Sequence, residues 1–368
     1  MTNSQLKTHN SRLRTQNLKL NFLETLSKFS DQKIAVIGDL ILDKYIYGKV
    51  ERISPEAPVP IVTVQRETFV PGGAANVAAN VASLSGRAFL LGIVGPDQFK
   101  DELIGKLEES KIDCRGVLID SSKHTTLKTR VIGLNQQLLR IDREDTHYIE
   151  SHFESEFLTR LKEIENLSAI ILSDYAKGTI TKELVVELKK FCSEKSIPLL
   201  VDPKPKHKDW YNNSFLVTPN KKEAQEMSGI TIESEEDFLT VGKKLVNDLS
   251  ANLIITAGSE GMYIFEKGKR DKVKGVREKE AFSDSTPNST LTTQNLSFSH
   301  ISTQAKEIYD VSGAGDTVVA TLALAISSGA SISQAAQLAN SAAGIKVGKM
   351  GTAPIFLEEL VKEIQKKD

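Results

Sequence analysis

The feature that most constrains this chain's fold is a regular alternation of short apolar segments with segments of helical periodicity. Helical patterns follow most of the apolar segments and occupy nearly all of 312–366. Such alternation predicts βαβ units, and therefore an α/β fold with a mainly parallel sheet covered by helices on both faces. The segments predicted as strands are KIAVIGDLILD (33–43), RAFLLGIVG (87–95), SAIILSD (168–174), IPLLVDP (197–203), SFLVTPN (214–220) and ANLIITAG (251–258).

The carboxyl ends of these strands predict the place of a ligand site, because sheets of this kind bind ligands beyond those ends. Acids, amides and glycines gather there, at Asp39–Asp43, Gly95–Asp97, Asp174, Asp202–Lys204, Pro219–Asn220 and Gly258. We therefore expect a polar site along one edge of the sheet.

Two β-rich stretches, 58–70 and 125–144, interrupt the alternation because no helical pattern separates their short strands. They predict antiparallel strands that form a small second sheet, with the first strand region extending from about 46 to 70. We interpret this sheet as a lid over the main sheet.

Two other segments depart from the pattern. Residues 1–20 are polar and contain no acid, which predicts a disordered tail, although a transit peptide is an alternative. Residues 21–30 have apolar side chains at helical spacing and predict a short helix that caps the domain. Residues 268–304 are first charged and then rich in Ser, Thr and Asn, which predicts a surface insertion or a disordered loop.

Composition excludes several classes of function. The chain has 368 residues with 47 Lys and Arg against 48 Asp and Glu, a net charge of -1, so it does not bind nucleic acid through bulk charge. No apolar run is long enough to span a membrane. The two cysteines, Cys114 and Cys192, suit a reducing compartment, and we expect a cytoplasmic protein. The six histidines lack metal-ligand spacing.

The strongest local motif is DVSGAGDTVVATLALAIS (310–327), in which small residues precede a long apolar helix. Backbone N–H groups are free at a helix N-terminus, so Gly313, Ala314 and Gly315 can receive a phosphate group. Asp316 lies in the first turn, where a carboxylate can take a proton from an alcohol beside a phosphoryl group. Alternatively, Asp316 only stabilises the helix start.

A second motif is PGGAANVAANVAS (71–83), which again opens a helix on a glycine turn. Gly72, Gly73 and Asn76 can bind sugar hydroxyls, although this motif taken alone favours the alternative, close packing of the helix on the sheet by Ala and Gly. The sequence contains no GxxxxGK[ST], and no GxGxxG follows a strand, so a nucleotide must be held by other means.

The two motifs, with TPNKKE (218–223) and TAGSEGMYIF (256–265) between them, resemble the signatures of the ribokinase-like (PfkB-type) carbohydrate kinases. The resemblance extends from Lys33 to about Leu360. It implies the ribokinase-like fold, a central mainly parallel sheet with a small β lid, for one kinase domain over 21–368.

A narrower resemblance, to the heptose 7-phosphate kinases, is carried by GDLILDKYIYGKVERISPEAPVPIV (38–62), LNQQLLRIDRE (134–144), LSDYAKGTIT (172–181), VDPK (201–204) and VGKMGTAP (347–354). That group phosphorylates C1 of D-glycero-β-D-manno-heptose 7-phosphate with ATP, for ADP-heptose and lipopolysaccharide core synthesis. The chain lacks the HxGH motif of a fused adenylyltransferase and resembles the stand-alone form. The alternatives are a related kinase for another sugar, and a catalytically silent binding protein.

On the nucleotide side, the resemblance implies that Asp316 is the base and that Gly313, Ala314 and Gly315 donate to the γ-phosphate. It further implies that Glu223 and Asn220 position Mg²⁺, partly through water, and it allows a monovalent cation. Lys204 is either a phosphate contact or a solvated lysine of its loop. The expected nucleotide-binding residues are Lys204, Asn220, Lys221, Lys222, Glu223, Gly258, Gly261 and Asn340.

On the sugar side, the resemblance implies that Asp43 accepts bonds from hydroxyl groups, together with Gly72, Gly73, Asn76 and Asp174. The 7-phosphate requires cations. The candidates are Arg52, Lys128, Arg130, Arg140 and Lys177, each of which can also be an exposed lid residue. The apolar run PVPIVTV predicts a homodimer through the lid, unless it packs within the lid itself.

Overall fold

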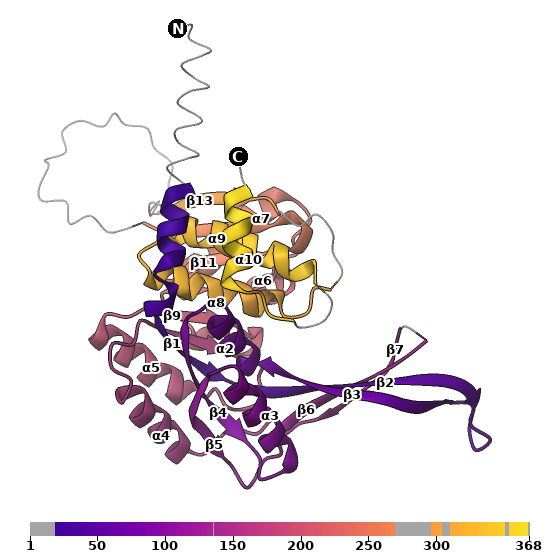
Figure 1. The fold of residues 1–368 in the computed structure, drawn as a ribbon. Helices are drawn as coiled ribbons and strands as arrows, with labels where there is room; N and C mark the ends of the chain where they lie inside the picture. Colours follow the sequence, from indigo (N-terminus) through magenta and orange to yellow (C-terminus); the bar gives the residue numbers. More distant parts are fainter. Residues whose placement is uncertain (1–18, 135, 269–295, 304–309, 350–352, 367–368) are drawn as a thin grey trace, which may run out of the picture.

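The main body of the protein is a three-layer α/β structure, from which a small sheet extends sideways (Figure 1). The computed structural model describes residues 19–134, 136–268, 296–303, 310–349 and 353–366. Its large sheet has nine strands in the order β13-β12-β11-β10-β9-β8-β1-β4-β5. Their bounds are Lys33–Gly38 (β1), Arg87–Val94 (β4), Asp113–Ile119 (β5), Ala169–Ser173 (β8), Leu199–Asp202 (β9), Leu216–Val217 (β10), Asn252–Thr256 (β11), Met262–Lys267 (β12) and Leu296–Ile301 (β13).

The described strands from β5 across to β11 pair in parallel, and only the β11–β12 and β12–β13 pairs of the described sheet are antiparallel. The prediction of a mainly parallel sheet with an α/β order is therefore confirmed. Such a sheet has both faces covered, so its strands are continuous apolar runs.

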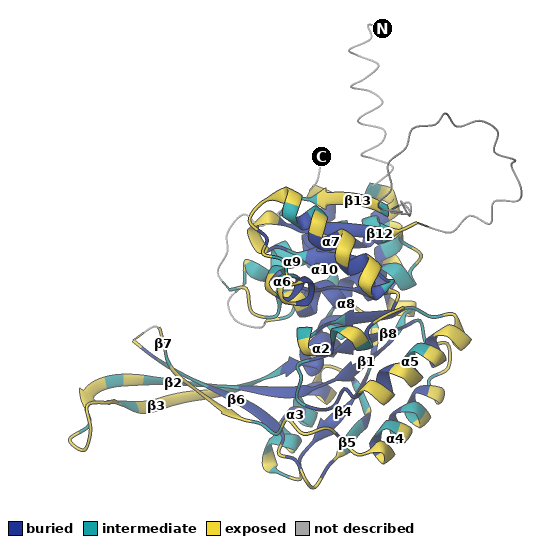
Figure 2. Ribbon diagram, turned by 180° about the vertical axis from the view of Figure 1, so that it is seen from behind, coloured by how far each residue is buried: buried dark blue, intermediate teal, exposed yellow. Residues whose placement is uncertain are grey.

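The helices divide between the two faces of the sheet, and alternate side chains of β1 show the division. Ile34 and Val36 pack in the core cluster with α2, α8 and α9, whereas Ala35 and Ile37 pack with α4, α5 and α7. Figure 2 shows the buried residues concentrated in the sheet between these layers. The helices are α2 (Ala74–Ser83), α3 (Gln98–Glu109), α4 (Ser151–Lys162), α5 (Lys182–Lys195), α6 (Lys221–Ser228), α7 (Glu235–Leu249), α8 (Ala314–Ser327), α9 (Ile332–Val347) and α10 (Leu357–Lys366).

The capping helix predicted at 21–30 is present with different bounds. Residues 19–27 are helical, and a 3-10 turn at Phe29–Asp31 (η1) follows. Phe22, Leu26 and Phe29 are buried in the core. Two further 3-10 turns are Pro205–Trp210 (η2) and Gly258–Glu260 (η3). Residues 1–18 of the predicted tail lie outside the described residues.

The small sheet, in the order β3-β2-β6-β7, confirms the predicted second sheet. Its strands are Leu40–Ile53 (β2), Pro60–Gly73 (β3), Thr126–Gly133 (β6) and Gln136–Arg143 (β7). The prediction that all its strands are antiparallel is wrong for one pair, because β2 and β6 run parallel. The predicted strand over 33–43 is also two strands, since the chain leaves the main sheet at Asp39 and enters the small one.

The prediction of a loop over 268–304 is wrong at its end. Leu296–Ile301 forms β13, which pairs antiparallel with β12 at the edge of the main sheet. The serine-rich composition concealed it, but an edge strand needs only a few apolar contacts, and Phe298 supplies them against Tyr263 and Phe265. Residues 269–295, most of the predicted insertion, lie outside the described residues. Among the residues described, no helix is long and apolar enough to cross a membrane.

Candidate active site

The N-terminus of α8 forms the centre of the site. Gly313 caps this helix with φ of +74°, a conformation that favours glycine. A methyl group on Gly313 would also stand 2.8 Å from Nδ2 of Asn76. At Gly315, by contrast, no atom outside its chain neighbours and the surrounding backbone of α8 lies within 4 Å of the position that a Cβ would take. The backbone of the first turn is therefore open to a ligand.

Asp316, in the first turn of α8, is buried and held by two hydrogen bonds. Asn76 Nδ2 donates to its Oδ2 at 2.5 Å, and the hydroxyl of Tyr175 donates to its Oδ1 at 2.9 Å. Burial raises the pKa of Asp316, and both hydrogen bonds oppose that change. The two sequence motifs, 240 residues apart, thus meet at one carboxylate with a fixed orientation.

Tyr175 was not predicted from the sequence. It follows β8 in a loop whose shape is set by Asp39, the residue between β1 and β2. The carboxylate of Asp39 accepts three backbone N–H groups, from Tyr175, Lys177 and Thr179. Burial, and then the charge of Asp174, raise the pKa of Asp39. The available signal in the sequence is the position of Tyr175 beyond the carboxyl end of β8, next to Asp174.

A cavity of about 400 Å³ opens beside the α8 turn. Its size lies in the range of pockets that hold small ligands. Gly258, Gly261 and Asn340, all predicted nucleotide-site residues, are part of its wall, and the Asn340 amide donates to the carbonyl of Ser302. The remaining lining residues are Asn220, Thr256, Ser259, Met262, Thr303, Val311, Ala314, Gly315, Val318, Ala343, Gly344 and Val347.

Asn220 and Glu223 form the start of α6 next to this cavity. Each side chain accepts the backbone N–H of the other, which is a capping box. The second oxygen of Glu223 accepts from Lys204 Nζ at 2.6 Å. Lys204 is therefore neither an isolated loop lysine nor unpaired.

An excess of carboxylates surrounds Lys204. Loss of solvent, with the charges of Asp316 and Glu223, raises the pKa of Asp202 well above its ordinary value. Nevertheless, among the residues that the structure describes, no group of three His, Cys, Asp or Glu side chains forms a ready metal site.

The two lysines of the TPNKKE segment have other acidic partners than Lys204. Lys221 pairs with Glu260, and Lys222 is 84% exposed on α6 with Glu226 at 3.8 Å.

The sugar-side candidates that the structure brings together lie at the base of the small sheet. Arg130 Nη1 donates to Oδ1 of Asp43 at 2.5 Å. A methyl group on Gly72 would stand 2.5 Å from Oδ2 of Asp43, so the glycine leaves room for this carboxylate. Asp43 lies near enough to Asp316 for its charge to contribute to the raised pKa of Asp316, after the larger effect of burial.

Lys128 and Lys177, the two lysines among the sugar-side candidates, share Glu144 as a partner. Lys128 binds Asp142 at 3.1 Å and Glu144 at 3.4 Å, and Lys177 binds Glu144 at 2.7 Å. Each of these cations is therefore paired with a carboxylate.

Three candidates differ from these in exposure or in contacts. Arg52 is exposed towards the far end of β2, and Arg140 is 53% exposed on β7 beside Asp142. Asp174 is 1% exposed, and its oxygens accept from Ala176, Tyr211 and His207 inside the protein. The expectation that Asp174 contacts the sugar is corrected, because these neighbours close it off.

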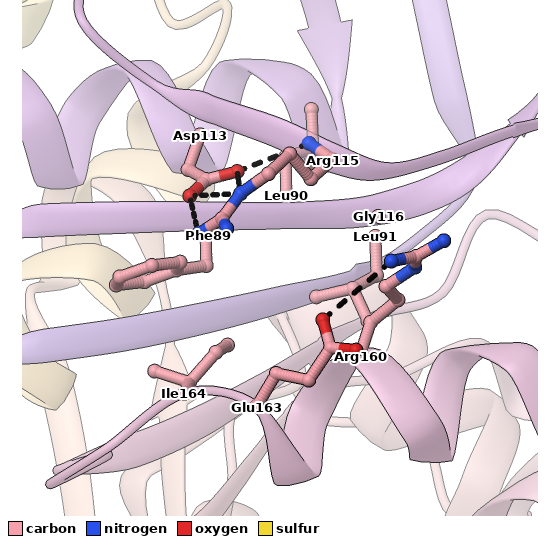
Figure 3. A pocket seen from close by; sticks show the side chains of 9 residues that line it. All are labelled: Phe89, Leu90, Leu91, Asp113, Arg115, Gly116, Arg160, Glu163 and Ile164. Carbon is pink, nitrogen blue, oxygen red and sulfur yellow. Dashed lines mark hydrogen bonds and ion pairs between the residues drawn. The ribbon is translucent and has the colours of Figure 1, made fainter.

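A second hollow, between β5 and α4, has a volume of only about 20 Å³ (Figure 3). Arg115 binds Asp113 beside it, and Arg160 pairs with Glu163. The volume is sufficient for about one water molecule. Such a water could satisfy Nε of Arg160, which is buried without a protein partner. We assign this hollow no function.

Comparison with known proteins extends over most of the chain. The model of the pfkB family of carbohydrate kinases matches residues 31–286 and 288–359. Bifunctional protein HldE of Desulfatibacillum aliphaticivorans is 38% identical over 342 residues, covering 92% of this chain and 64% of that protein. Bifunctional protein HldE of Geobacter sulfurreducens is 39% identical over 329 residues, which cover 89% of this chain and 61% of that protein. The chain thus spans less than two thirds of these relatives.

Solved structures show the same fold at low sequence identity. Arabidopsis thaliana ribokinase, complexed with ribose and ATP, has a TM-score of 0.66 at 16% identity, covering 91% of this chain and 99% of that one. Phosphofructokinase-2 from Escherichia coli, in complex with substrates and products, has a TM-score of 0.69 at 17% identity, covering 91% and 98%.

Proposed function

Because the chain belongs to the pfkB family of carbohydrate kinases, we propose that it transfers the γ-phosphoryl group of ATP to C1 of D-glycero-β-D-manno-heptose 7-phosphate. The product is the 1,7-bisphosphate, an intermediate for ADP-heptose and the lipopolysaccharide core. The observation that carries the chemistry is the buried, doubly bonded Asp316 beside an open helix N-terminus. The heptose assignment is supported by the 38% and 39% identical HldE relatives.

Asp316 acts as the general base. Its carboxylate accepts the proton of the attacking hydroxyl on C1, so that the oxygen can bond to the γ-phosphorus while the bond to the β-phosphate oxygen breaks. Asn76 and Tyr175 hold the carboxylate in place for this step. The raised pKa of Asp316 makes it a better proton acceptor than an exposed aspartate.

The N-terminal turn of α8 stabilises the transferred phosphoryl group. Backbone N–H groups of Gly313 and Gly315 precede the first bond of the helix, that from Thr317 to the carbonyl of Gly313, and the helix dipole favours negative charge there. The N–H of Ala314 donates to the carbonyl of Val311 at 3.2 Å, a bond that a phosphate would have to replace. Because Ala314 and Gly315 line the cavity, a triphosphate that occupies it can reach this turn. Gly258, Gly261 and Asn340 border the same cavity and contact the nucleoside part.

The acids around Lys204 fit a divalent cation that enters with ATP. Mg²⁺ prefers oxygen ligands, keeps several waters and uses one or two carboxylates together with substrate phosphates. Glu223 and Asp202 supply these carboxylates, and Asn220 fixes Glu223 through the capping box. When bound, Mg²⁺ neutralises charge on the β- and γ-phosphates, and Lys204 contacts a phosphate.

The sugar phosphate lies between Asp43 and the cations at the base of the small sheet. Asp43, Gly72, Gly73 and Asn76 bind hydroxyl groups close to Asp316. Arg130, Lys128 and Lys177 bind the 7-phosphate in place of their present carboxylate partners. A kinase for a different sugar phosphate is the alternative, since the fold alone does not select the acceptor.

A substrate panel tests the proposal. The protein is incubated with MgATP and the heptose 7-phosphate, hexose 6-phosphates, pentose 5-phosphates or free sugars, and ADP release is followed. Phosphorus NMR then identifies the position of the new phosphate. We expect the heptose 7-phosphate to have the highest kcat/KM and a 1-phosphate product. Faster turnover of a hexose or pentose phosphate would reject the heptose assignment, and a parallel Asp316→Asn preparation controls for contaminating kinases.

We also propose a homodimer through the small sheet, in the cytoplasm. The sheet exposes large apolar side chains, each more than half exposed, at Ile53, Val59, Val64, Leu139 and Ile141. Light scattering should give the mass of a dimer for the wild type and of a monomer for Val64→Glu. Val186→Glu, on exposed α5, is the matched control and should stay dimeric. A monomeric wild type would reject the dimer.

A further inference from the structure

Lys346, near the end of α9, is a lysine without exposed surface. Its Nζ donates to the backbone carbonyl of Ala353 at 2.8 Å. Burying an ammonium group costs free energy unless hydrogen bonds and opposite charges compensate it. An apolar side chain would fill the same volume without that cost, so the charge of Lys346 requires an explanation.

The stem of Lys346 lies against the turn that opens α8. A methyl group on Gly313 would stand 3.6 Å from Cε of Lys346 and 3.7 Å from Oδ2 of Asp316. The next residue of α9, Val347, accepts the backbone N–H of Asp310, and the side chain of Asp310 accepts the N–H of Ser312. The end of α9 therefore contacts the turn. Gly344 and Val347 line the cavity, whereas Lys346 between them does not.

The charge of Lys346 acts on acids at both ends of the turn. Burial has the largest effect and lowers the pKa of Lys346 to about 8. Asp310 and Asp316 attract its ammonium group, whereas the charge of Lys349 repels it. Conversely, the charge of Lys346 counteracts the rise in the pKa of Asp316. A cation near a helix N-terminus is unfavourable with respect to the helix dipole. These two carboxylates and the Ala353 carbonyl provide the compensation.

We propose that Lys346 is a built-in cation of the phosphate-binding turn. It is a positioning residue: its ammonium group donates to the Ala353 carbonyl, and its charge attracts Asp310 and Asp316. In this way it holds the turn in the shape that receives the triphosphate. Because the charge is supplied by the chain itself, phosphoryl transfer does not need a dissociable monovalent cation. This inference rests on the proposed kinase activity.

The first test uses the unmodified protein. Kinase activity is measured in tetramethylammonium buffer with K⁺, Na⁺ and NH₄⁺ added in turn, with Mg²⁺ constant. We expect kcat to change less than about twofold, because the turn already contains its cation. A large activation of the wild type by K⁺ would overturn the proposal, and this result requires no variant to fold.

The second test removes the ammonium group. In Lys346→Ala, we expect kcat to fall about 10- to 100-fold, the scale of effect for a donor that organises a phosphate or oxyanion site. NH₄⁺ or K⁺, which fit the space left by the side chain, should restore most of the loss. Lys346→Gln, which retains bulk without charge, should lose activity and not respond to cations.

Lys189→Met is the matched control, since Lys189 also donates to backbone carbonyls, those of Trp210 and Asn212, but on another part of the protein. It should retain activity and show no response to cations. Wild-type activity in Lys346→Ala, or a loss that no cation restores in a protein of unchanged melting temperature, would overturn the proposal.

Calorimetric binding of a non-hydrolysable ATP analogue tests the role of Lys346 separately from the proposed kinase activity. If no sugar is phosphorylated, the proposed function fails, but Lys346→Ala should still bind the analogue more weakly and regain affinity with NH₄⁺. Unchanged affinity with and without NH₄⁺ would reject the role of Lys346 itself.

Discussion

The α8 turn and the base of the small sheet both present polar groups to one site, but they are built differently. At the turn, Asp316 is buried and held by neutral donors from Asn76 and Tyr175. At the base of the small sheet, Arg130 and Lys128 are held by carboxylates, those of Asp43 and Asp142. The first arrangement is complete before a substrate binds, whereas in the second a phosphate must compete with carboxylates for its cations.

This difference assigns different tasks to the two regions. Fixed groups suit a proton transfer, because the geometry requires no rearrangement during the reaction. Exchangeable ion pairs suit the recognition of a charged substrate, since cations can pass from carboxylate to phosphate. Variants of the turn should therefore mainly change kcat, and variants of the small sheet should mainly change KM for the sugar phosphate.

The largest effect is expected for Asp316→Asn. Loss of the base should lower kcat by about three orders of magnitude or more, while ATP affinity changes little. The raised pKa of Asp316 means that the folded protein loses stability as the pH rises through the range between its unfolded and folded values. The variant should therefore melt no lower than the wild type at neutral pH. Stopped-time ADP assays measure kcat, and a melting curve measures the stability of the variant. Near-normal turnover would contradict the role of Asp316 as the base.

Arg130→Met should raise KM for the sugar phosphate about 10- to 100-fold and leave KM for ATP unchanged, because Arg130 lies beside Asp43 at the base of the sheet. Arg140→Met, on exposed β7, is the matched control and should change neither constant. Equal effects of the two substitutions on steady-state kinetics would show that the phosphate lies elsewhere on the small sheet.

Tyr175→Phe should lower kcat about tenfold and move the acid limb of the pH profile upwards. The Tyr175 hydroxyl lowers the pKa of Asp316, so its removal raises that pKa, and activity is lost at a higher pH as the pH falls. The pH dependence of kcat/KM measures the shift. An unchanged acid limb would indicate that Asp316 does not act as a base in its ionised form.

Gly315→Ala should have the smallest effect. The new methyl group meets no protein atom, and alanine in a helix is worth about 0.5–1 kcal/mol, so the melting temperature should rise. The methyl group should also obstruct the phosphates and weaken ATP binding by a few-fold. Gly313→Ala, at a φ of +74°, should instead lower the melting temperature. Stronger ATP binding by Gly315→Ala in calorimetry would exclude a phosphate at this position.

Most of the fold could be predicted from local pattern. Strands such as β1 and β9 are buried on both faces and are therefore continuous apolar runs, which is a signal that a sequence shows directly. The prediction failed where one strand passes into another sheet at Asp39, and where the polar edge strand β13 depends on its contacts with β12. Both features depend on partners distant in the sequence.

Part of the site could also be predicted, where the residue type depends on local backbone geometry. The patterns of helix starts and glycine turns predicted Gly313–Asp316, Gly72 and Asn76 as site residues. A backbone that must approach a phosphate or a carboxylate restricts the residue type locally, so the sequence shows it. Nothing local distinguished Arg130 from Arg140 on the neighbouring strands of the small sheet. The two are direct partners in the pairing of β6 with β7. Their surroundings differ because β6 lies beside β2, which brings Arg130 to Asp43, whereas β7 is the edge strand of the small sheet.

By itself, then, the sequence determined the α/β order, the family and the positions of the two glycine-rich helix starts, because these depend on periodicity and on backbone geometry within a few residues. Only the tertiary structure decided that Tyr175 bonds to Asp316, that Asp174 is closed off, and that Lys346 lies buried against the turn. Burial and partner choice depend on the packing of segments up to hundreds of residues apart, and that packing sets both the pKa and the orientation of each group.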